Sequence, residues 1–377
     1  MVDWLIEASP QDPGWSEYTW QTFKRAGVIH GVGPLLYRTL SGRDWLEPDI
    51  EGWLEQQYTL NQARINRMQQ EGQAILAGFA ADNIPAIPLK GLVLSQKYYP
   101  DPALRPMSDL DFLIAPHDFG RCLKRLEKLG YRPQQTSWKH IRFVKPDNGR
   151  VVSPAADHPD NPRWVEVHLA CREMFGGPVY DLTGRMWDGA IEDDFLGRRA
   201  RLLPPDLMWL HQAIHTSADL WRGQGRLIQL VDLLRLTPQA PDLASTVKQV
   251  DGRFIYLSLS LLKRTFPQAV DDAIFEDGQS RVSSAFRRWA DSFDLVNASH
   301  INPDPRPVYV MQVLRFNEGR WRELLQALRY IFWPSRQEMM VATGELEAAQ
   351  NRRRYLRYWL RHVGRLLVRL FQRAVEK

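Results

Sequence analysis

The sequence contains only two cysteines, Cys122 and Cys171, among its 377 residues. Two cysteines are too few for a disulfide framework or for a zinc site built from several cysteines. Such a low cysteine content is typical of proteins in a reducing compartment. We therefore expect a cytoplasmic protein that is stabilised by ordinary hydrophobic cores.

Long hydrophobic runs are also missing. No uncharged apolar stretch approaches the roughly 20 residues that a membrane-spanning helix needs. Residues 1–9 include acidic residues and no long apolar run, so they do not form a signal peptide. These absences favour the cytoplasm, and they leave open a peripheral contact with the inner membrane.

The main body of the chain lacks an excess of positive charge. The net charge is +5, but residues 351–377 contain eight Arg and one Lys against one Glu. Residues 1–350 therefore carry a net charge of −3, and the isoelectric point of about 9.2 reflects the tail. A body of this charge has no extended surface for nucleic acid.

The distribution of apolar residues predicts an α+β protein with several parts. Helical spacing in residues 53–82, a mixed pattern after them, and helical segments following Pro204-Pro205 indicate the divisions. The predicted parts are an N-terminal helical region (1–82), a small mixed-sheet α/β domain (83–202), a C-terminal helical domain (203–350) and a basic amphipathic helix (351–377).

Individual elements follow from periodicity and from the breakers between them. We predict strands at 84–88, 110–114, 141–144 and 164–169, and helices at 92–99, 117–129, 206–217, 226–236, 254–266 and 320–332. The segment 146–163 is rich in Pro, Asp and Asn and is predicted to be a loop. Residues 302–307 are rich in proline and are predicted to be a connector.

The most informative stretch contains two aspartates, Asp109 and Asp111, at the start of an apolar segment. Side chains two residues apart on a strand project from the same face, so both carboxylates would point together. Their mutual repulsion would be relieved by divalent cations. Other acidic pairs of this spacing lie in polar or helix-like surroundings, where a solvated role is the better interpretation: Asp49/Glu51, Glu192/Asp194 and Glu345/Glu347.

A third carboxylate, Glu166, lies in the alternating segment 164–169 with His168 on the same face. A buried acid is costly unless it is paired or binds metal. Three carboxylates from two adjacent strands can hold two metal ions, one activating the attacking hydroxyl and one stabilising the leaving group. For His168 we favour a hydrogen bond to Glu166 over direct metal ligation.

Two features could bind phosphate. Lys90-Gly91, at a strand-to-helix junction, offers a cation and backbone N–H groups for a triphosphate. Arg105 could grip phosphate as well, although an arginine in a loop is more often a solvated surface residue.

Together these motifs resemble the bacterial uncharacterised nucleotidyltransferase family, which belongs to the DNA polymerase beta-like superfamily. The resemblance covers roughly residues 30–360. The motifs that carry it are Leu89-Lys90-Gly91, Tyr98-Tyr99, Leu104-Arg105, Asp109-Leu110-Asp111-Phe112-Leu113-Ile114, Val165-Glu166-Val167-His168, Leu210-His211, His215, Leu230-Val231-Asp232-Leu233-Leu234 and Ile331-Phe332-Trp333-Pro334.

The resemblance implies a polymerase beta-like domain that transfers a nucleoside monophosphate from a nucleoside triphosphate, such as ATP, to a hydroxyl and releases pyrophosphate. It implies Asp109, Asp111 and Glu166 as catalytic Mg²⁺ ligands, with two ions, and Gly91 in the nucleotide-binding turn. The wider superfamily usually has Gly-Ser or Gly-Gly before the first aspartate, whereas this chain has Gly91-Leu92. The missing hydroxyl puts triphosphate binding in question, and Lys90 or Ser95 could compensate for it.

Two other functions remain open. His211 and His215 are four residues apart on a predicted helix, and with Asp232 they could form a phosphohydrolase metal site, although no Glu follows His211 as a metalloprotease motif requires. Alternatively, the chain could be a non-catalytic nucleotide-binding scaffold that its tail recruits to partners or to an anionic membrane.

The tail itself shows a regular pattern of arginines. They recur every four residues opposite an apolar face, which is typical of a basic amphipathic helix that lies on anionic membranes. A terminal helix docked on the acidic body is the alternative. The arginines are Arg353, Arg357, Arg361, Arg365, Arg369 and Arg373.

Overall fold

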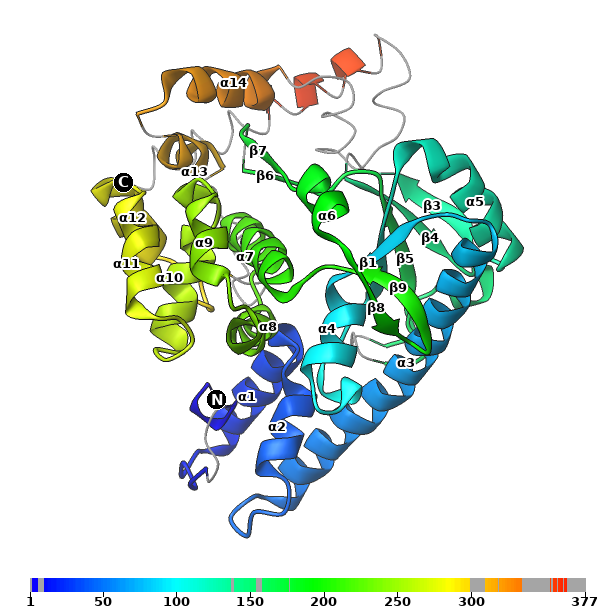
Figure 1. The fold of residues 1–377 in the computed structure, drawn as a ribbon. Helices are drawn as coiled ribbons and strands as arrows, with labels where there is room; N and C mark the ends of the chain where they lie inside the picture. Colours follow the sequence, from blue (N-terminus) through cyan, green and yellow to red (C-terminus); the bar gives the residue numbers. More distant parts are fainter. Residues whose placement is uncertain are drawn as a thin grey trace.

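The computed structural model shows an α+β protein, as the sequence predicts. A five-stranded sheet lies between helices from the N-terminal part and helices from the C-terminal part (Figure 1). The structure describes residues 2–5, 10–136, 139–153, 158–175, 177–298, 309–317, 319–333, 353, 355–357, 359–361 and 363–364.

Three helices form the N-terminal part: α1 (Glu17–His30), α2 (Gly33–Leu40) and α3 (Pro48–Ala81). The α3 helix is the long diagonal helix of Figure 1, and it links α1 and α2 to the sheet. It begins five residues before the predicted helix because Pro48 occupies its first turn, where proline needs no hydrogen-bond donor.

The sheet has the strand order β1-β2-β5-β4-β3. Its strands are β1 (Ala86–Leu89), β2 (Asp109–Ile114), β3 (Arg132–Thr136), β4 (His140–Val144) and β5 (Trp164–His168). The β2 and β5 strands are parallel, while the other neighbouring pairs are antiparallel. The parallel pair lies side by side although the paired residues are 55 positions apart in sequence, as in Asp111 and Glu166.

One face of the sheet is apolar and packs on α3 and α5 (Phe119–Lys128). Phe112 on β2 meets Phe79 of α3 edge to face, with ring centroids 5.8 Å apart. Because side chains alternate along a strand, the residues between these apolar ones face the opposite side. That opposite side carries the polar residues Asp109, Asp111, His140, Arg142, Glu166 and His168.

The sequence missed β3 and two hairpins. The hairpins are β6 (Arg172–Met174) with β7 (Val179–Asp181), and β8 (Ile191–Phe195) with β9 (Arg198–Leu202). All of these strands are rich in charged or polar residues, which have low β-propensity, and their pairing depends on tertiary context. The α6 helix (Thr183–Gly189), which connects the two hairpins, was also not predicted.

The C-terminal part is helical, and the four helices predicted there correspond to α7, α8, α10 and α14. The predicted connector 302–307 and Pro334 lie outside the described residues. The helices are α7 (Pro205–Arg222), α8 (Leu227–Leu236), α9 (Leu243–Lys248), α10 (Tyr256–Thr265), α11 (Asp272–Ser280), α12 (Ser284–Asp291), α13 (Tyr309–Phe316) and α14 (Trp321–Phe332).

The described pieces of the tail, between residues 353 and 364, are helical. The indole N–H of Trp359 donates a hydrogen bond to the carbonyl oxygen of Phe332, at 2.6 Å, and Leu356 and Leu360 are more than half exposed. Arg365, Arg369 and Arg373 of the predicted pattern lie outside the described residues. Over the part that the structure describes, no helix combines the length and apolarity needed to cross a bilayer.

A buried arginine on α3 anchors the segments that lead into β2 and β5. Arg64 donates hydrogen bonds at 2.8–3.1 Å to five backbone carbonyl oxygens, and only 1% of its surface is exposed. These carbonyls belong to residues that directly precede the two strands: Met107, Ser108, His158, Asn161 and Pro162. Helix α3 therefore fixes the segments that lead into β2 and β5, the strands that carry Asp109, Asp111 and Glu166.

A buried histidine on α1 should make the fold sensitive to acid. His30 accepts a hydrogen bond on Nδ1 from the backbone N–H of Leu227, and burial, helped by Arg226, lowers its pKa from 6.5 to about 4. Between these values the unfolded chain binds a proton that the folded chain does not, so stability falls as the pH drops. Between pH 7.5 and 4.5, we expect the free energy of unfolding of the wild type to fall by about 3 kcal/mol more than that of His30→Asn, measured with urea.

Other acidic and histidine groups contribute to this pH dependence in both proteins and cancel in the comparison. An equal loss of stability in wild type and His30→Asn over the same pH range would contradict the role of His30.

Candidate active site

The parallel pairing of β2 with β5 brings two of the predicted acids together. Asp111 lies directly opposite Glu166 in the strand register, and Asp109 lies opposite Trp164. Since Asp109 and Asp111 are two residues apart on β2, all three carboxylates belong to the same polar face. The sequence analysis expected the acids on two adjacent strands, and the register adds that Asp111 is paired with Glu166.

Asp111 is the most buried of the three acids, with 1% of its surface exposed. Its Oδ1 atom accepts a hydrogen bond from Lys90 Nζ at 2.8 Å and lies 2.8 Å from His168 Nε2. Burial by itself would raise its pKa, but Lys90 and His168 hold the pKa of Asp111 well below its usual range. Asp111 is therefore a carboxylate at neutral pH.

The second oxygen of Asp111, Oδ2, is buried and has no hydrogen-bond partner among the described residues. A buried carboxylate oxygen without a partner is unfavourable, and oxygen atoms of this kind are the ligands that Mg²⁺ prefers. The donors on this face therefore fit a divalent cation held by Asp109 and Asp111, with Glu166 beside them.

Glu166 has a different environment. Its Oε1 atom accepts hydrogen bonds from Arg142 Nε at 3.0 Å and Nη2 at 2.6 Å, while Oε2 lies 3.3 Å from His140 Nδ1. Burial, together with the negative charges of Asp109 and Asp111, raises the pKa of Glu166 to about 7. Two neighbouring carboxyl groups whose pKa values are pushed apart are a common arrangement for acid–base chemistry.

His140 is a site residue that the sequence analysis missed. It is the first residue of β4 and lies opposite His168 in the register. The predicted strand at 141–144 began one residue too late, and an extension by one residue would have put His140 on the face of Arg142. Burial, together with the neighbouring His168, lowers the pKa of His140 to about 3, so its imidazole is neutral at neutral pH.

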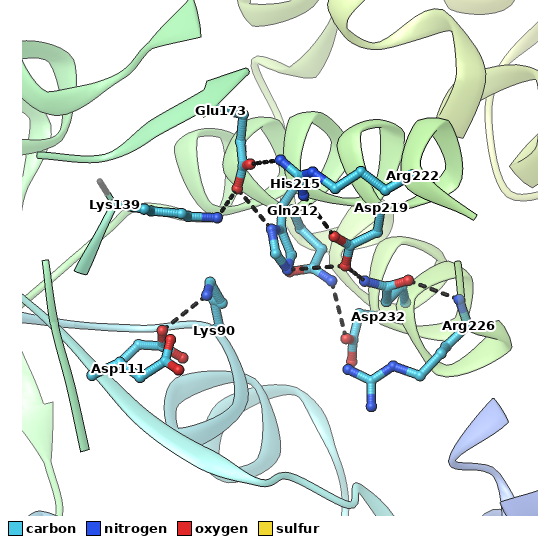
Figure 2. Close-up of polar contacts among 12 residues, drawn as sticks. Lys90, Asp111, Lys139, Glu173, Gln212, His215, Asp219, Arg222, Arg226 and Asp232 are labelled. Carbon is cyan, nitrogen blue, oxygen red and sulfur yellow. Dashed lines mark hydrogen bonds and ion pairs between the residues drawn. The ribbon is translucent and has the colours of Figure 1, made fainter. Parts of the chain in front are cut away.

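Lys90 and Gly91 lie where β1 passes directly into α4 (Lys90–Tyr98). Figure 2 shows the Lys90 ammonium pointing toward Asp111. Burial would lower the pKa of Lys90, but the charges of Asp111, Glu166 and Asp109 raise it, so the side chain is a cation. Lys90 also has a positive φ of 47°, which is uncommon for a residue with a side chain.

The first turn of α4 has no side-chain cap, because its N-cap residue, Leu89, forms no side-chain hydrogen bond to it. The N-terminus of a helix attracts phosphate through its unpaired N–H groups. Gly91 is needed for close packing, because a Cβ there would come within 2.9 Å of Arg105 Nη1 and 3.0 Å of Met107 Cβ.

Comparison with known proteins identifies the family. A family model described as an uncharacterised nucleotidyltransferase matches residues 16–267, about two thirds of the chain. The chain belongs to the uncharacterised nucleotidyltransferase family. No curated protein and no solved structure matches the chain. Family membership supports a transferase that uses a nucleotide, and the match includes all of the sheet and its polar face.

From the sequence, Arg105 was considered as a phosphate contact. In the structure, its side chain pairs with an aspartate of the helical part. It is 7% exposed and forms a bidentate pair with Asp232 of α8, at 2.8 Å and 2.7 Å. Tyr99 donates a further hydrogen bond to Asp232 at 2.8 Å. Arg105 therefore joins the α/β domain to the helical part, and we leave it out of the phosphate-binding group.

Two of the three residues of the phosphohydrolase alternative, Asp232 and His215, have partners outside the group. Asp232 pairs with Arg105, while His215 Nδ1 lies 2.8 Å from an oxygen of Glu173 and its Nε2 lies 3.4 Å from Asp219. The rings of His211 and His215 have centroids 6.4 Å apart. Among the described residues they do not form a shared group of metal ligands with Asp232.

A second buried polar network lies near Lys90 and Asp111 (Figure 2). Glu173 of β6 accepts contacts from Lys139, from His215 at 2.8 Å and from Arg222 at 2.8 Å. Burial would raise the pKa of Glu173, but these three neighbours hold it well below its usual range. The network ties the start of β4, and thus His140, to helix α7.

Proposed function

We propose that the protein transfers a nucleoside monophosphate from a nucleoside triphosphate to a hydroxyl acceptor, with release of pyrophosphate. The observation that carries this proposal is the juxtaposition of Asp111 with Glu166 across two parallel strands, with Lys90 Nζ 2.8 Å from Asp111. This arrangement brings together, on one face of the sheet, acids that would bind a metal cation, a carboxylate that would act as the base and a lysine that would bind phosphate.

In the proposed reaction, Asp109 and Asp111 hold Mg²⁺ against the triphosphate. When bound, Mg²⁺ would neutralise the negative charge of the phosphates. Two ions are the usual number for this chemistry. Lys90 and the first N–H groups of α4 bind the phosphate oxygens. Lys90 would exchange its contact with Asp111 for one with phosphate as the nucleotide enters.

The transfer itself breaks one bond and forms another. The acceptor oxygen attacks the α-phosphorus, the bond from that phosphorus to the β-phosphate oxygen breaks, and pyrophosphate leaves with the electron pair. Glu166 receives the hydroxyl proton, since a pKa of about 7 suits a general base at neutral pH. Arg142 orients Glu166 through its two hydrogen bonds to Oε1.

A labelling screen tests the proposed reaction. Lysate is incubated with the purified protein, Mg²⁺ and each α-labelled nucleoside triphosphate in turn, and the labelled product and pyrophosphate are followed. A labelled acceptor formed together with pyrophosphate supports transfer. Nucleotide binding in a titration, without pyrophosphate release in any lysate fraction, would favour the scaffold alternative.

Replacing Lys90 should weaken nucleotide binding. A charged hydrogen bond to a ligand contributes about 1.5–3 kcal/mol, so we expect Lys90→Met to raise the Kd for Mg²⁺-nucleotide about 10- to 100-fold in calorimetric titration. Lys97→Met is the matched control, because Lys97 lies on the same helix but pairs with the exposed Asp193. Equal affinity in both variants, with intact circular dichroism, would remove Lys90 from the site.

A further inference from the structure

Two histidines of the polar face lie near the same oxygen of Glu166. His140 Nδ1 lies 3.3 Å from Glu166 Oε2. His168 Nε2 lies 3.9 Å from that oxygen and 2.8 Å from Asp111 Oδ1, so Asp111 and not Glu166 is its hydrogen-bond partner. The three ligand atoms of this imidazole–carboxylate cluster (His140, Glu166 and His168) lie within 4.8 Å of one another. His168 and Glu166 are 1% and 3% exposed, so the cluster is largely removed from water.

These spacings suit a bound metal ion. Ligand atoms at about 2.1 Å from one ion lie about 3–4 Å from each other, and small side-chain shifts would close the cluster around an ion. The backbone already provides the arrangement, since His140 lies opposite His168 across β4 and β5. Arg142 holds the other oxygen of Glu166, which leaves Oε2 directed at the two imidazoles.

The ligand types identify the kind of ion. Imidazole nitrogen binds Zn²⁺, Co²⁺ and other first-row transition metals, whereas Mg²⁺ takes oxygen ligands. A set of two imidazoles and one carboxylate is one that such metals bind with positions left open for water or substrate. We propose that His140, Glu166 and His168 bind one transition-metal ion, separately from the Mg²⁺ expected at Asp109 and Asp111.

The second ion would affect the reaction, a consequence that rests on the proposed function. Glu166 Oε2 can accept the acceptor's proton or coordinate an ion, but not both. Occupation of the cluster therefore inhibits transfer, and removal of the ion restores it. The metal level of the cell would in this way regulate the enzyme through the oxygen that serves as its base.

Binding is tested first, without any need for activity. The full-length protein, freed of metal with a chelator, is titrated with Co²⁺ by visible absorption and with Zn²⁺ by calorimetry, in the presence of excess Mg²⁺. We expect one Co²⁺ or Zn²⁺ per chain, and His140→Gln should weaken binding by about 100-fold or more. His117→Gln is the matched control, because His117 is an exposed histidine outside the cluster.

Equal affinity of His140→Gln and His117→Gln, or complete displacement of the ion by Mg²⁺, would overturn the proposal. Glu166→Gln provides a second variant that should also lose the ion, and circular dichroism establishes that each variant is folded. If an acceptor is found, Zn²⁺ should inhibit wild type and leave His140→Gln resistant, each relative to its own activity in Mg²⁺ alone. Binding without inhibition would keep the ion site and remove Glu166 as the base.

Discussion

Asp109→Asn is expected to lower kcat/KM for nucleotidyl transfer by about 1000-fold. The substitution removes one negative charge from the cation site while it keeps the shape of the side chain, and loss of one charge-stabilising group at a reaction centre costs about that much. Asp109 is a better target than Asp111, which is buried against Lys90 and whose removal would leave that cation unpaired.

The same variant should remain folded. Asp109 is half-buried, so we expect the melting temperature to change by no more than about 2 °C. Asp194→Asn is the control, since Asp194 belongs to another acidic pair on the exposed β8–β9 hairpin and pairs with Arg199. Retained Mg²⁺-dependent transfer in Asp109→Asn would refute the assignment of the site.

Asp232→Ala is expected to lower the free energy of unfolding by about 3–5 kcal/mol, measured with urea. The substitution leaves the guanidinium of Arg105 buried without its carboxylate, and breaking a buried pair by removing one partner costs this much. Tyr99 and Gln212 also lose the acceptor of their hydrogen bonds. The effect is large because Asp232 is completely buried.

A double variant separates the ion pair from packing. Arg105→Met combined with Asp232→Leu replaces both charges by apolar groups, and we expect it to regain most of the lost stability. Asp194→Ala, which breaks an exposed pair, should change stability by less than about 0.5 kcal/mol. A loss under 1 kcal/mol in Asp232→Ala would mean that water reaches Arg105 in the folded protein.

The connection through Asp232 also bears on function. Arg105 contacts the helical part through Asp232 and lies close to Gly91, where an added Cβ would meet it at 2.9 Å. The junction that carries Lys90 is therefore supported by a pair between the two parts of the chain. Loss of this pair should disturb the phosphate-binding turn as well as the stability.

The polar face shows how far local sequence can predict a site. The apolar run 110–114 and the alternation along 164–169 correctly predicted two strands, and strand geometry correctly put Asp109 with Asp111, and Glu166 with His168, on common faces. Period-two patterning is a property of each strand alone, so it can be seen without the fold. Long helices such as α3 and α7 were predicted for the same reason, from their apolar spacing.

Residues missed by the sequence analysis depend on contacts between distant segments. His140 is the first residue of β4, and as a polar residue it gives no apolar signal for the start of a strand. In addition, β4 lies beside β5 only in the folded sheet. Arg64 looks like one more polar residue of α3, but it binds carbonyls more than forty residues away. Their roles come from partners that no local pattern identifies.

The local pattern of the chain was enough to specify its α+β character, its strand faces and its candidate acids, because strand and helix periodicity depend on neighbouring residues. The parallel pairing of β2 with β5, the partner of Arg105 and the gathering of His140 with Glu166 and His168 depend on the three-dimensional packing. Arginine side chains can donate to solvent, acids or carbonyls, and histidine side chains can also bind metals, so the role of each residue depends on which groups the fold brings within reach.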